Sequence, residues 1–382
     1  YMITRPSGTS DIFKAEMVCA LEEAAESGFE IVAPGTIEYI AGQEYDASAI
    51  QLNRVYGNGR TEPLPITDTN ITIDASAFSN VAGEYDILVQ YKMYEPQIIK
   101  VTVYELEGIE LGFNATEKIG NTSQNNGVYF NQTVKRIYKL NEEFNPSYLS
   151  VKALTAFNGK TKEFLLPETA FVINTSGFDS TVEGEKVIYV SVTSNENTVT
   201  ESFKVHVVST EPSMNNDAVQ IKVDGNYTGT IGAVVDGFNT FVTIQQSLNY
   251  LENLGINYNA KKKLILLSAG TYREKLEVTL PNIELRGAGK EETIIEWNSL
   301  YGIPDESGYV QTTDSCSTFN VREKATNMLI TGVTISNYWN SLSVFDKDLG
   351  PGYAEHRALA LLVQADQFVM KDCKLLGYQD TI

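Results

Sequence analysis

Histidine and cysteine are scarce in this chain. It has only two histidines, His206 and His356, and three cysteines, Cys19, Cys316 and Cys373. Ser–His and Cys–His nucleophile chemistry needs a histidine beside the nucleophile, so this scarcity disfavours both. The cysteines lie far apart and lack metal-ligand spacing, which favours buried thiols, although a bridge between the second and third stays open. We expect no metal and no cofactor.

Long apolar runs and positive charge are also lacking. No stretch of about 18 apolar residues occurs, so no membrane-spanning helix is predicted. The chain has 29 Lys and Arg against 49 Asp and Glu, a formal net charge of −20. Nucleic-acid binding needs a basic face, so this balance argues against it. The first residues, Tyr1-Met2-Ile3, show no signal-peptide pattern, yet the many Thr, Asn, Ser and Tyr favour an extracellular protein.

The chain begins with a helical pattern. Residues 11–26, DIFKAEMVCALEEAAE, predict an amphipathic helix that Ser10 or Asp11 can cap and Gly28 can end. We assign residues 1–28 to this segment, as the tail of an upstream domain or as a packing helix.

Residues 29–209 change to short alternating stretches with an internal repeat. ITIDASAF (71–78) matches FVINTSGF (171–178), and GEYDILVQY (83–91) parallels GEKVIYVSV (184–192). Period-two patterning with frequent turn signals is typical of β-sandwiches. The two units, 29–106 and 107–209, resemble the tandem bacterial Ig-like domains of secreted and cell-surface proteins. This resemblance implies spacers, with carbohydrate or cell-wall binding as the alternative.

A polar linker, 210–218, precedes a third kind of pattern in residues 219–382. One helix is predicted, with Thr243 as its N-cap and Gly255 as its stop. Short apolar runs then recur after Asn282, Asn327 and Gln367, with long insertions at 298–316 and 338–356. Repeated short strands with variable loops predict a right-handed parallel β-helix, with a sandwich or jelly roll as the alternative. The fold class is therefore all-β.

Three stretches of residues 219–382 resemble the pectin methylesterase (pectinesterase) family. They are VVDGFNTFVTIQQSL (234–248), GTYRE (270–274) and ALALLVQADQFVMKDCKLLGYQDTI (358–382). They occur in the family's order and at reasonable distances. The resemblance implies a parallel β-helix, secretion, and hydrolysis of methyl esters on pectin, which would be the partner.

The chemistry of an ester hydrolase can be argued from the residue types. Methyl ester hydrolysis needs a nucleophile, a proton donor for methanol and a group that holds the oxyanion. Two close carboxylates share one negative charge, so one keeps its proton while the other attacks. By resemblance, Asp380 is the general acid and later the base, and Gln379 donates to the oxyanion. Without the surrounding motif, these two residues would be a turn.

One residue departs from the family pattern. Arg357 stands where the family usually has a glutamine that donates to the oxyanion. Its guanidinium could take over that role, bind a galacturonate carboxylate, or form a surface ion pair.

Aromatic residues near the motifs are candidates for stacking on sugar rings. We expect Tyr378 and Tyr272 to line the groove, and Trp339 to be a sugar platform, with packing as the alternative for each. Glu274 in the GTYRE motif is interpreted as structural rather than catalytic.

The family's other motifs are missing. Its nucleophilic Asp lies in a D-F-I-F-G-like stretch and its Arg in an L-G-R-P-W-like stretch, and residues 1–382 contain neither. We therefore expect a C-terminally truncated catalytic domain that is inactive by itself. A pectate lyase on the same scaffold and a non-catalytic wall-binding adhesin are the alternative functions, and a bacterial secreted or cell-surface location is expected throughout.

Overall fold

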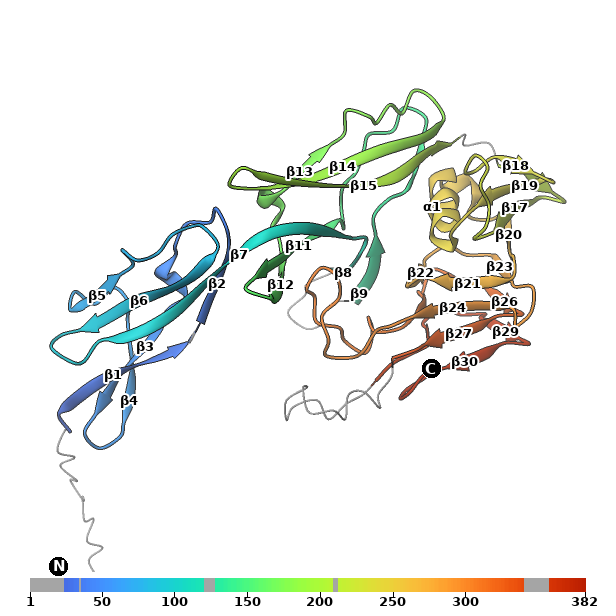
Figure 1. Cartoon of the computed structure of the whole chain (residues 1–382). Coiled ribbons are helices and arrows are strands. Elements are labelled where there is room, and N and C mark those ends of the chain that lie inside the picture. The colour runs from blue at the N-terminus through green and yellow to red at the C-terminus, as the bar shows by residue number, and fades with distance from the viewer. Residues whose placement is uncertain (1–23, 34–35, 120–127, 209–211, 340–356) are drawn as a thin grey trace, which may run out of the picture. The chain divides into compact units, whose positions relative to one another are not determined.

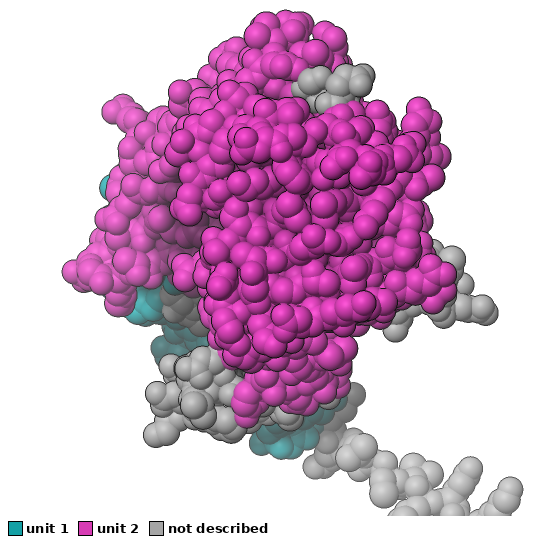
Figure 2. Space-filling view, turned by 90° about the vertical axis from the view of Figure 1, so that its right-hand side faces the viewer, with its two compact units in different colours: residues 1–104 teal, residues 105–382 magenta. Residues whose placement is uncertain are grey.

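A computed structural model describes residues 24–33, 36–119, 128–208, 212–339 and 357–382. The chain forms two compact units, residues 1–104 and 105–382, which Figure 2 colours separately. Within the described ranges, no helix is long and apolar enough to cross a membrane. Cys316 and Cys373 are free thiols, so the bridge between them is not formed, and Cys19 lies outside the described residues.

The first unit is a β-sandwich. One sheet pairs three antiparallel strands, β1 (Glu26–Ala33), β3 (Gln51–Tyr56) and β4 (Thr61–Leu64). The other contains β5 (Ile71–Asp74), β6 (Gly83–Tyr91), the first part of β7 (Gln97–Gly112) and β2 (Thr36–Ile40), and a 3₁₀ turn spans Ala47–Ala49. Phe29 and Leu52 from one sheet meet Ile87 and Val101 from the other in a buried core. The expected Ig-like fold is confirmed.

The expected boundary of the helical segment is wrong at its C-terminal end. Residues 26–28 belong to β1, whose partner strand β3 supplies backbone hydrogen bonds from Gln51–Tyr56. Strand pairing prevails here over the local helical pattern. Residues 24 and 25 are not helical either, and the earlier part of that expected helix lies outside the described residues.

The second Ig-like domain repeats this arrangement. Its strands are the end of β7, β8 (Asn114–Ile119), β9 (Val128–Thr133), β10 (Ile137–Lys139), β11 (Ser150–Phe157), β12 (Lys160–Leu165), β13 (Val172–Asn174), β14 (Gly184–Ser194) and β15 (Asn197–Val208), with a 3₁₀ turn at Glu168–Ala170.

A tyrosine contact occurs at matching places in both Ig-like domains. The Tyr39 hydroxyl bonds the backbone of Asp46, donating to its C=O at 3.1 Å and accepting from its N–H at 2.9 Å. The Tyr138 hydroxyl makes the same two contacts with Asn145, at 3.1 and 3.3 Å. The internal repeat found in the sequence is therefore a repeat of structure.

Residues 212–339 and 357–382 form a parallel β-helix of three sheets (Figure 1). The first sheet contains β17 (Ala218–Val223), β20 (Lys262–Leu267), β23 (Ile283–Arg286), β26 (Leu329–Thr331) and β29 (Val369–Lys371), extended by β16 (Met214–Asn215), β18 (Val234–Val235) and β19 (Phe238–Phe241). The second contains β21 (Gly270–Arg273), β24 (Thr293–Trp297), β27 (Thr334–Asn337) and β30 (Lys374–Leu376). The third contains β22 (Leu276–Val278), β25 (Phe319–Val321) and β28 (Leu361–Val363).

Apolar side chains stack from coil to coil inside this β-helix. The parallel register places side chains of one kind above each other, as in the stacks Ile265–Leu285–Ile330–Met370 and Leu276–Phe319–Leu361. A single coil cannot bury such a row alone, so each coil depends on its neighbour. In the last described coil Met370 and Leu375 are only partly buried, while Val369 and Leu376 are exposed.

The recurring turn residues mark one corner of the coil. Asn282, Asn327 and Gln367 lie where the chain passes from the third sheet to the first in successive coils. All three have positive φ, at 62°, 56° and 59°. Asn tolerates this left-handed conformation better than most residues. The Asn327 side chain also donates to the Asn282 side chain at 2.8 Å, which joins two coils. The loose repeat of the sequence is thus a repeat of this corner.

The expected linker, residues 210–218, extends too far at its C-terminal end. Strand β16 lies within it and β17 begins at its last residue, Ala218, because both pair with each other in the first sheet.

Helix α1 (Ile244–Leu254), which a 3₁₀ turn at Ile256–Tyr258 follows, covers the first end of the β-helix. Thr243 caps it in a capping box with Gln246, and Gly255 ends it with φ of 84°, both as predicted. Glu274 completes the start, because its carboxylate accepts the backbone N–H groups of Ile244 and Gln245 at 2.9 and 2.8 Å. The structural interpretation of Glu274 is consistent with this contact.

Glu274 gives a prediction about pH. Burial raises the pKa of Glu274 to about 7. The two N–H groups act in the opposite direction, because they favour the ionised carboxylate. A raised pKa means that the folded state holds the proton more tightly than the unfolded state, so stability falls as pH rises from about 4.5 to 7. We expect denaturant titrations to show this fall, and to show it reduced in Glu274→Gln. The control is Glu291→Gln, which removes an exposed carboxylate. If the wild-type protein instead became more stable relative to Glu274→Gln as pH rises from about 4.5 to 7, the N–H bonds would outweigh burial in setting the pKa of Glu274.

Candidate functional site

The candidate site lies at the corner where the chain passes from the second sheet to the third. In successive coils this connection is Glu274–Lys275, residues 298–318, residues 338–360 and, after β30, residues 377–382. The long insertion at 298–316 therefore leaves the β-helix at the corner that also carries Gln379 and Asp380, and the described residues that flank 340–356 lie at the same corner. This stacking brings together residues that are far apart in sequence.

Asn337, at the end of β27, holds this corner together. Its side-chain amide group lies within hydrogen-bonding distance of the carbonyl oxygens of Ser299 (2.8 Å), Leu359 (3.1 Å) and Cys316 (3.2 Å). The side-chain oxygen of Asn337 accepts a hydrogen bond from the backbone N–H of Ser299 at 3.3 Å. A buried amide with this many partners fixes the first insertion against the segment that leads into β28.

Arg357 lies just before β28, and its guanidinium reaches three groups. Nη1 donates to the Thr313 hydroxyl at 2.6 Å, and Nε lies 3.3 Å from a carboxylate oxygen of Asp380. The guanidinium carbon is 5.3 Å from the centre of the Tyr301 ring. Thr313 and Tyr301 belong to the first insertion, so Arg357 connects that insertion to the last coil. A guanidinium with such partners is held in a defined orientation.

Gln379 and Asp380 lie in an exposed segment that runs beside residues 358–361. The Gln379 carbonyl accepts the N–H of Ala358 at 3.0 Å, and Thr381 accepts those of Ala360 and Leu361. A Cβ at Gly377 would lie 2.7 Å from the carbonyl oxygen of Ala358, so this close approach requires glycine. Asp380 has φ of 54°, and half of its side chain is exposed. The carboxylate is thus accessible to a ligand beside a fixed cation.

The other predicted groove residues have different surroundings. Tyr378 is 52% exposed and adjoins Gln379, which suits a groove residue. Trp339 is partly buried at the start of the second insertion, and its role as a sugar platform stays a prediction. His356 lies outside the described residues.

The groove role predicted for Tyr272 is wrong. The residue is 5% exposed and begins the inward stack of the second sheet, over Ile295. Its hydroxyl donates to the Ser268 carbonyl at 2.9 Å and lies 3.2 Å from that of Val223. The GTYRE motif does not show whether the tyrosine side chain points into the β-helix or out of it. The strand register places this side chain in the core.

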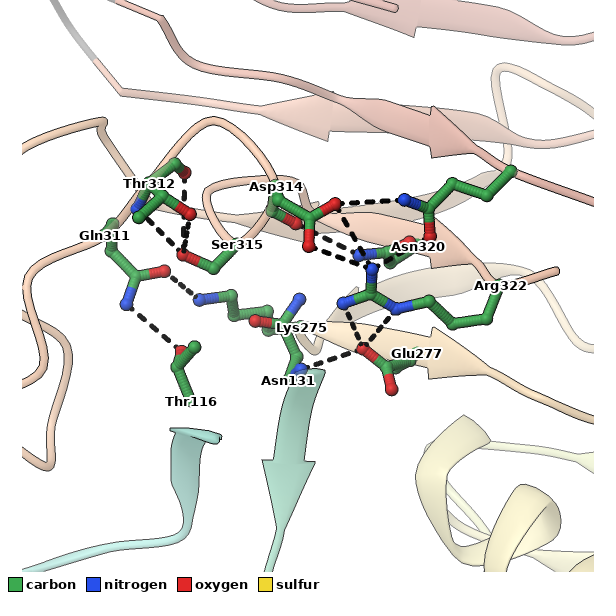
Figure 3. Close-up of polar contacts among 11 residues, drawn as sticks. Thr116, Asn131, Lys275, Glu277, Gln311, Thr312, Asp314, Ser315, Asn320 and Arg322 are labelled. Atoms are coloured by element: carbon green, nitrogen blue, oxygen red, sulfur yellow. Dashed lines mark hydrogen bonds and ion pairs between the residues drawn. The ribbon is translucent and has the colours of Figure 1, made fainter. Parts of the chain in front are cut away.

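The third sheet carries a set of buried polar residues that the sequence did not reveal (Figure 3). Arg322 donates to the Glu277 carboxylate from Nε at 2.9 Å and Nη2 at 2.8 Å, and from Nη1 to Asp314 at 3.1 Å. Nη1 also donates to Gln364 at 2.9 Å. Arg322 and Glu277 are almost completely buried. The sequence signal was Glu277 inside the apolar run KLEVTL and Arg322 directly after the run STFNV.

The second Ig-like domain contributes to this set. The backbone N–H of Asn131 in β9 donates to the Glu277 carboxylate at 2.8 Å, and Gln311 joins Lys275 (2.5 Å) to Thr116 (3.3 Å) in β8. Figure 3 shows the ends of β8 and β9 directly below these residues. Burial raises the pKa of Glu277 while Arg322 acts in the opposite direction, and burial lowers that of Lys275 to about 8. Charged groups therefore mediate this contact.

Comparisons with known proteins divide the chain in the same way. Residues 230–382 match the family model "Pectinesterase", and residues 36–103 match the model "Bacterial Ig-like domain (group 3)". The predicted resemblance to part of a pectinesterase catalytic domain, with Ig-like modules before it, is confirmed.

Three relatives illustrate the similarity. Pectinesterase/pectinesterase inhibitor 18 of Arabidopsis thaliana is 29% identical over 158 residues, 41% of this chain and 24% of that protein. Pectate lyase L of Thermoclostridium stercorarium is 30% identical over 103 residues, 25% of this chain and 8% of that protein. Among solved structures, pectin methylesterase PemA from Erwinia chrysanthemi is 23% identical with a TM-score of 0.34, covering 42% of this chain and 44% of that chain. The matches span less than half of each relative.

The buried pair of Arg322 and Glu277 gives a stability prediction. In Arg322→Met the carboxylate of Glu277 stays buried without its cation, which costs about 3–5 kcal/mol. We expect a loss of this size in denaturant unfolding, and a smaller loss in the double variant with Glu277→Gln, because that variant removes the unpaired charge.

The control is Lys204→Met, which breaks the exposed pair Lys204–Glu185 (2.9 Å) and should cost below about 1 kcal/mol. Equal losses in Arg322→Met and Lys204→Met would contradict the structural importance of the buried pair.

Proposed function

We propose that the protein carrying this chain is a carboxylic ester hydrolase that removes methyl esters from pectin. The observation that carries the proposal is the juxtaposition of Arg357 and Asp380, 3.3 Å apart, at one corner of a parallel β-helix. Both residues fall within the region that matches the pectinesterase model. An exposed carboxylate beside a fixed guanidinium, with Gln379 next to it in the sequence, suits a reaction that moves a proton and builds an oxyanion.

In the proposed reaction two aspartates act in turn. A carboxylate from the family's D-F-I-F-G-like motif attacks the ester carbonyl carbon, and Asp380 protonates the methoxy oxygen as the C–O bond breaks, so methanol leaves. Gln379 stabilises the oxyanion that forms during the attack. Asp380 then takes a proton from water, and the resulting hydroxide opens the acyl anhydride, releasing the free galacturonate and restoring the nucleophile.

Arg357 is the second proposed donor to the oxyanion. Its Nη1 bond to Thr313 and its contact with Asp380 hold the guanidinium at the site. Arg357 stands at the position where the family usually has a glutamine. We propose that it donates to the oxyanion as that glutamine would, but with a positively charged group instead of a neutral amide.

We propose that residues 1–382 are inactive by themselves, because neither the D-F-I-F-G-like nor the L-G-R-P-W-like motif occurs in them. We also propose that the protein acts outside a bacterial cell, where the Ig-like modules serve as spacers or bind the cell wall.

A lyase is the second candidate, since one relative is named a pectate lyase. The two reactions give different products, because hydrolysis releases methanol and lyase cleavage leaves an unsaturated uronide. A wall-binding protein without chemistry would give neither.

The activity prediction concerns a chain extended through the two remaining family motifs. On methylated polygalacturonate we expect methanol release and no unsaturated product. Asp380→Asn should lower kcat about a hundredfold or more, because the proton donor is lost. Asp366→Asn, an exposed carboxylate in the same coil, is the matched control and should retain activity.

Methanol release by Asp380→Asn at the wild-type rate would remove Asp380 from the mechanism. Turnover by residues 1–382 without the extension would overturn the proposed inactivity of this chain.

A further inference from the structure

A cleft lies between the second Ig-like domain, helix α1 and the edge of the third sheet. Its volume is about 850 Å³, within the range of small-molecule sites. Its walls include Tyr148 and Lys135 from the Ig-like domain, Asn249 from α1, and Lys324 after β25. None of its lining residues is Asp380, Gln379 or Arg357, so it is separate from the candidate active site.

The lining is rich in amides. Eight of the 19 lining residues are Asn or Gln. Amides both donate and accept hydrogen bonds, which matches a ligand whose hydroxyl groups also do both. Three acidic and three basic side chains balance each other in the lining. An uncharged, strongly polar ligand therefore fits better than an anion, a cation or a lipid.

Two of these amides have polar atoms without a partner among the described residues. The side-chain amide nitrogen of Asn249 has none, although its oxygen accepts from Gln245 at 2.9 Å. Neither polar atom of the Asn131 side chain has one. Both residues are 8% exposed. Buried amides usually find a partner, so these positions have hydrogen-bonding capacity that the described residues do not use.

Tyr148 adds an aromatic side chain to the wall. It has φ of 71°, which is rare for a tyrosine and marks a position held by its surroundings. Its hydroxyl donates to the Glu117 carboxylate at 2.7 Å, which restrains the ring. A restrained aromatic ring beside many amides is a combination that can bind the apolar face and the hydroxyl groups of a sugar together.

We propose that this cleft is a saccharide-binding site shared by the second Ig-like domain and the β-helix, with a neutral oligosaccharide as its preferred ligand. Arg322 and Gln364 line the cleft, and both reach Asp314, the neighbour of Thr313, which Arg357 contacts. The cleft and the candidate active site are therefore joined through residues 313–314. The proposal does not require the ester hydrolase activity.

The test uses residues 1–382 in native gels that contain neutral β-linked glucan or galactan, or polygalacturonate, with calorimetric titration of the matching oligosaccharides. We expect retardation by a neutral polysaccharide. Tyr148→Ala should weaken binding about tenfold or more, as truncation of a central aromatic contact does. Asn249→Ala should weaken it as well, and Tyr148→Phe should weaken it less than Tyr148→Ala, because the ring is kept and only its bond to Glu117 is lost.

Controls separate this site from the other. Tyr189→Ala, at an exposed tyrosine of β14 outside the cleft, should bind like the wild type, as should Asp380→Asn. If polygalacturonate binds instead and Lys324→Ala weakens it, the ligand is the acidic polymer in the same cleft and the preference for a neutral chain is wrong. Absence of binding to every polysaccharide, or unchanged binding by both Tyr148→Ala and Asn249→Ala, would overturn the proposal.

Discussion

The stacking of coils is the constraint on which the β-helix depends. Each coil presents a row of apolar side chains that it cannot bury alone, and parallel register places them above the row of the coil before. Tyr272, Ile295, Ile335 and Leu375 form one such row in the second sheet. Because the register is fixed by this burial, every corner of one coil lies over the same corner of the next.

The candidate site follows from that geometry. Arg357 and Asp380 are at opposite ends of one coil, yet they meet because the chain returns to the same corner after passing through the three sheets. The first insertion adds Thr313 and Tyr301 from the coil before. Asn337 fixes these segments through backbone carbonyl groups, so the side chains of the candidate site are positioned by contacts that involve none of the proposed reacting groups.

The sequence predicted the elements better than their environment. The strands, helix α1 with its Thr243 cap, and the recurrence at Asn282, Asn327 and Gln367 follow from periodicity and turn chemistry, which are local. The direction of Tyr272 could not be predicted, because either face of a short strand can be apolar in a molecule with many tyrosines. The partners of Arg357 were open for the same reason, since two of them lie in an insertion whose path no periodicity describes. Glu277 and Arg322 were missed because a charge in an apolar run is usually solvent-facing.

The contact between the second Ig-like domain and the β-helix is therefore more than a linker would provide. An apolar contact would tolerate small rotations, whereas the Glu277 carboxylate must keep two guanidinium bonds and the Asn131 N–H or remain buried with an unpaired charge. Because of this cost, the observed arrangement of β9 on the third sheet is much more stable than slightly rotated or shifted arrangements. A cleft whose walls come from both domains needs such a fixed arrangement, because its amides can meet one ligand together only when the walls keep their spacing. The buried charges and the cleft thus have a common explanation: the Ig-like domain is held as part of the binding surface.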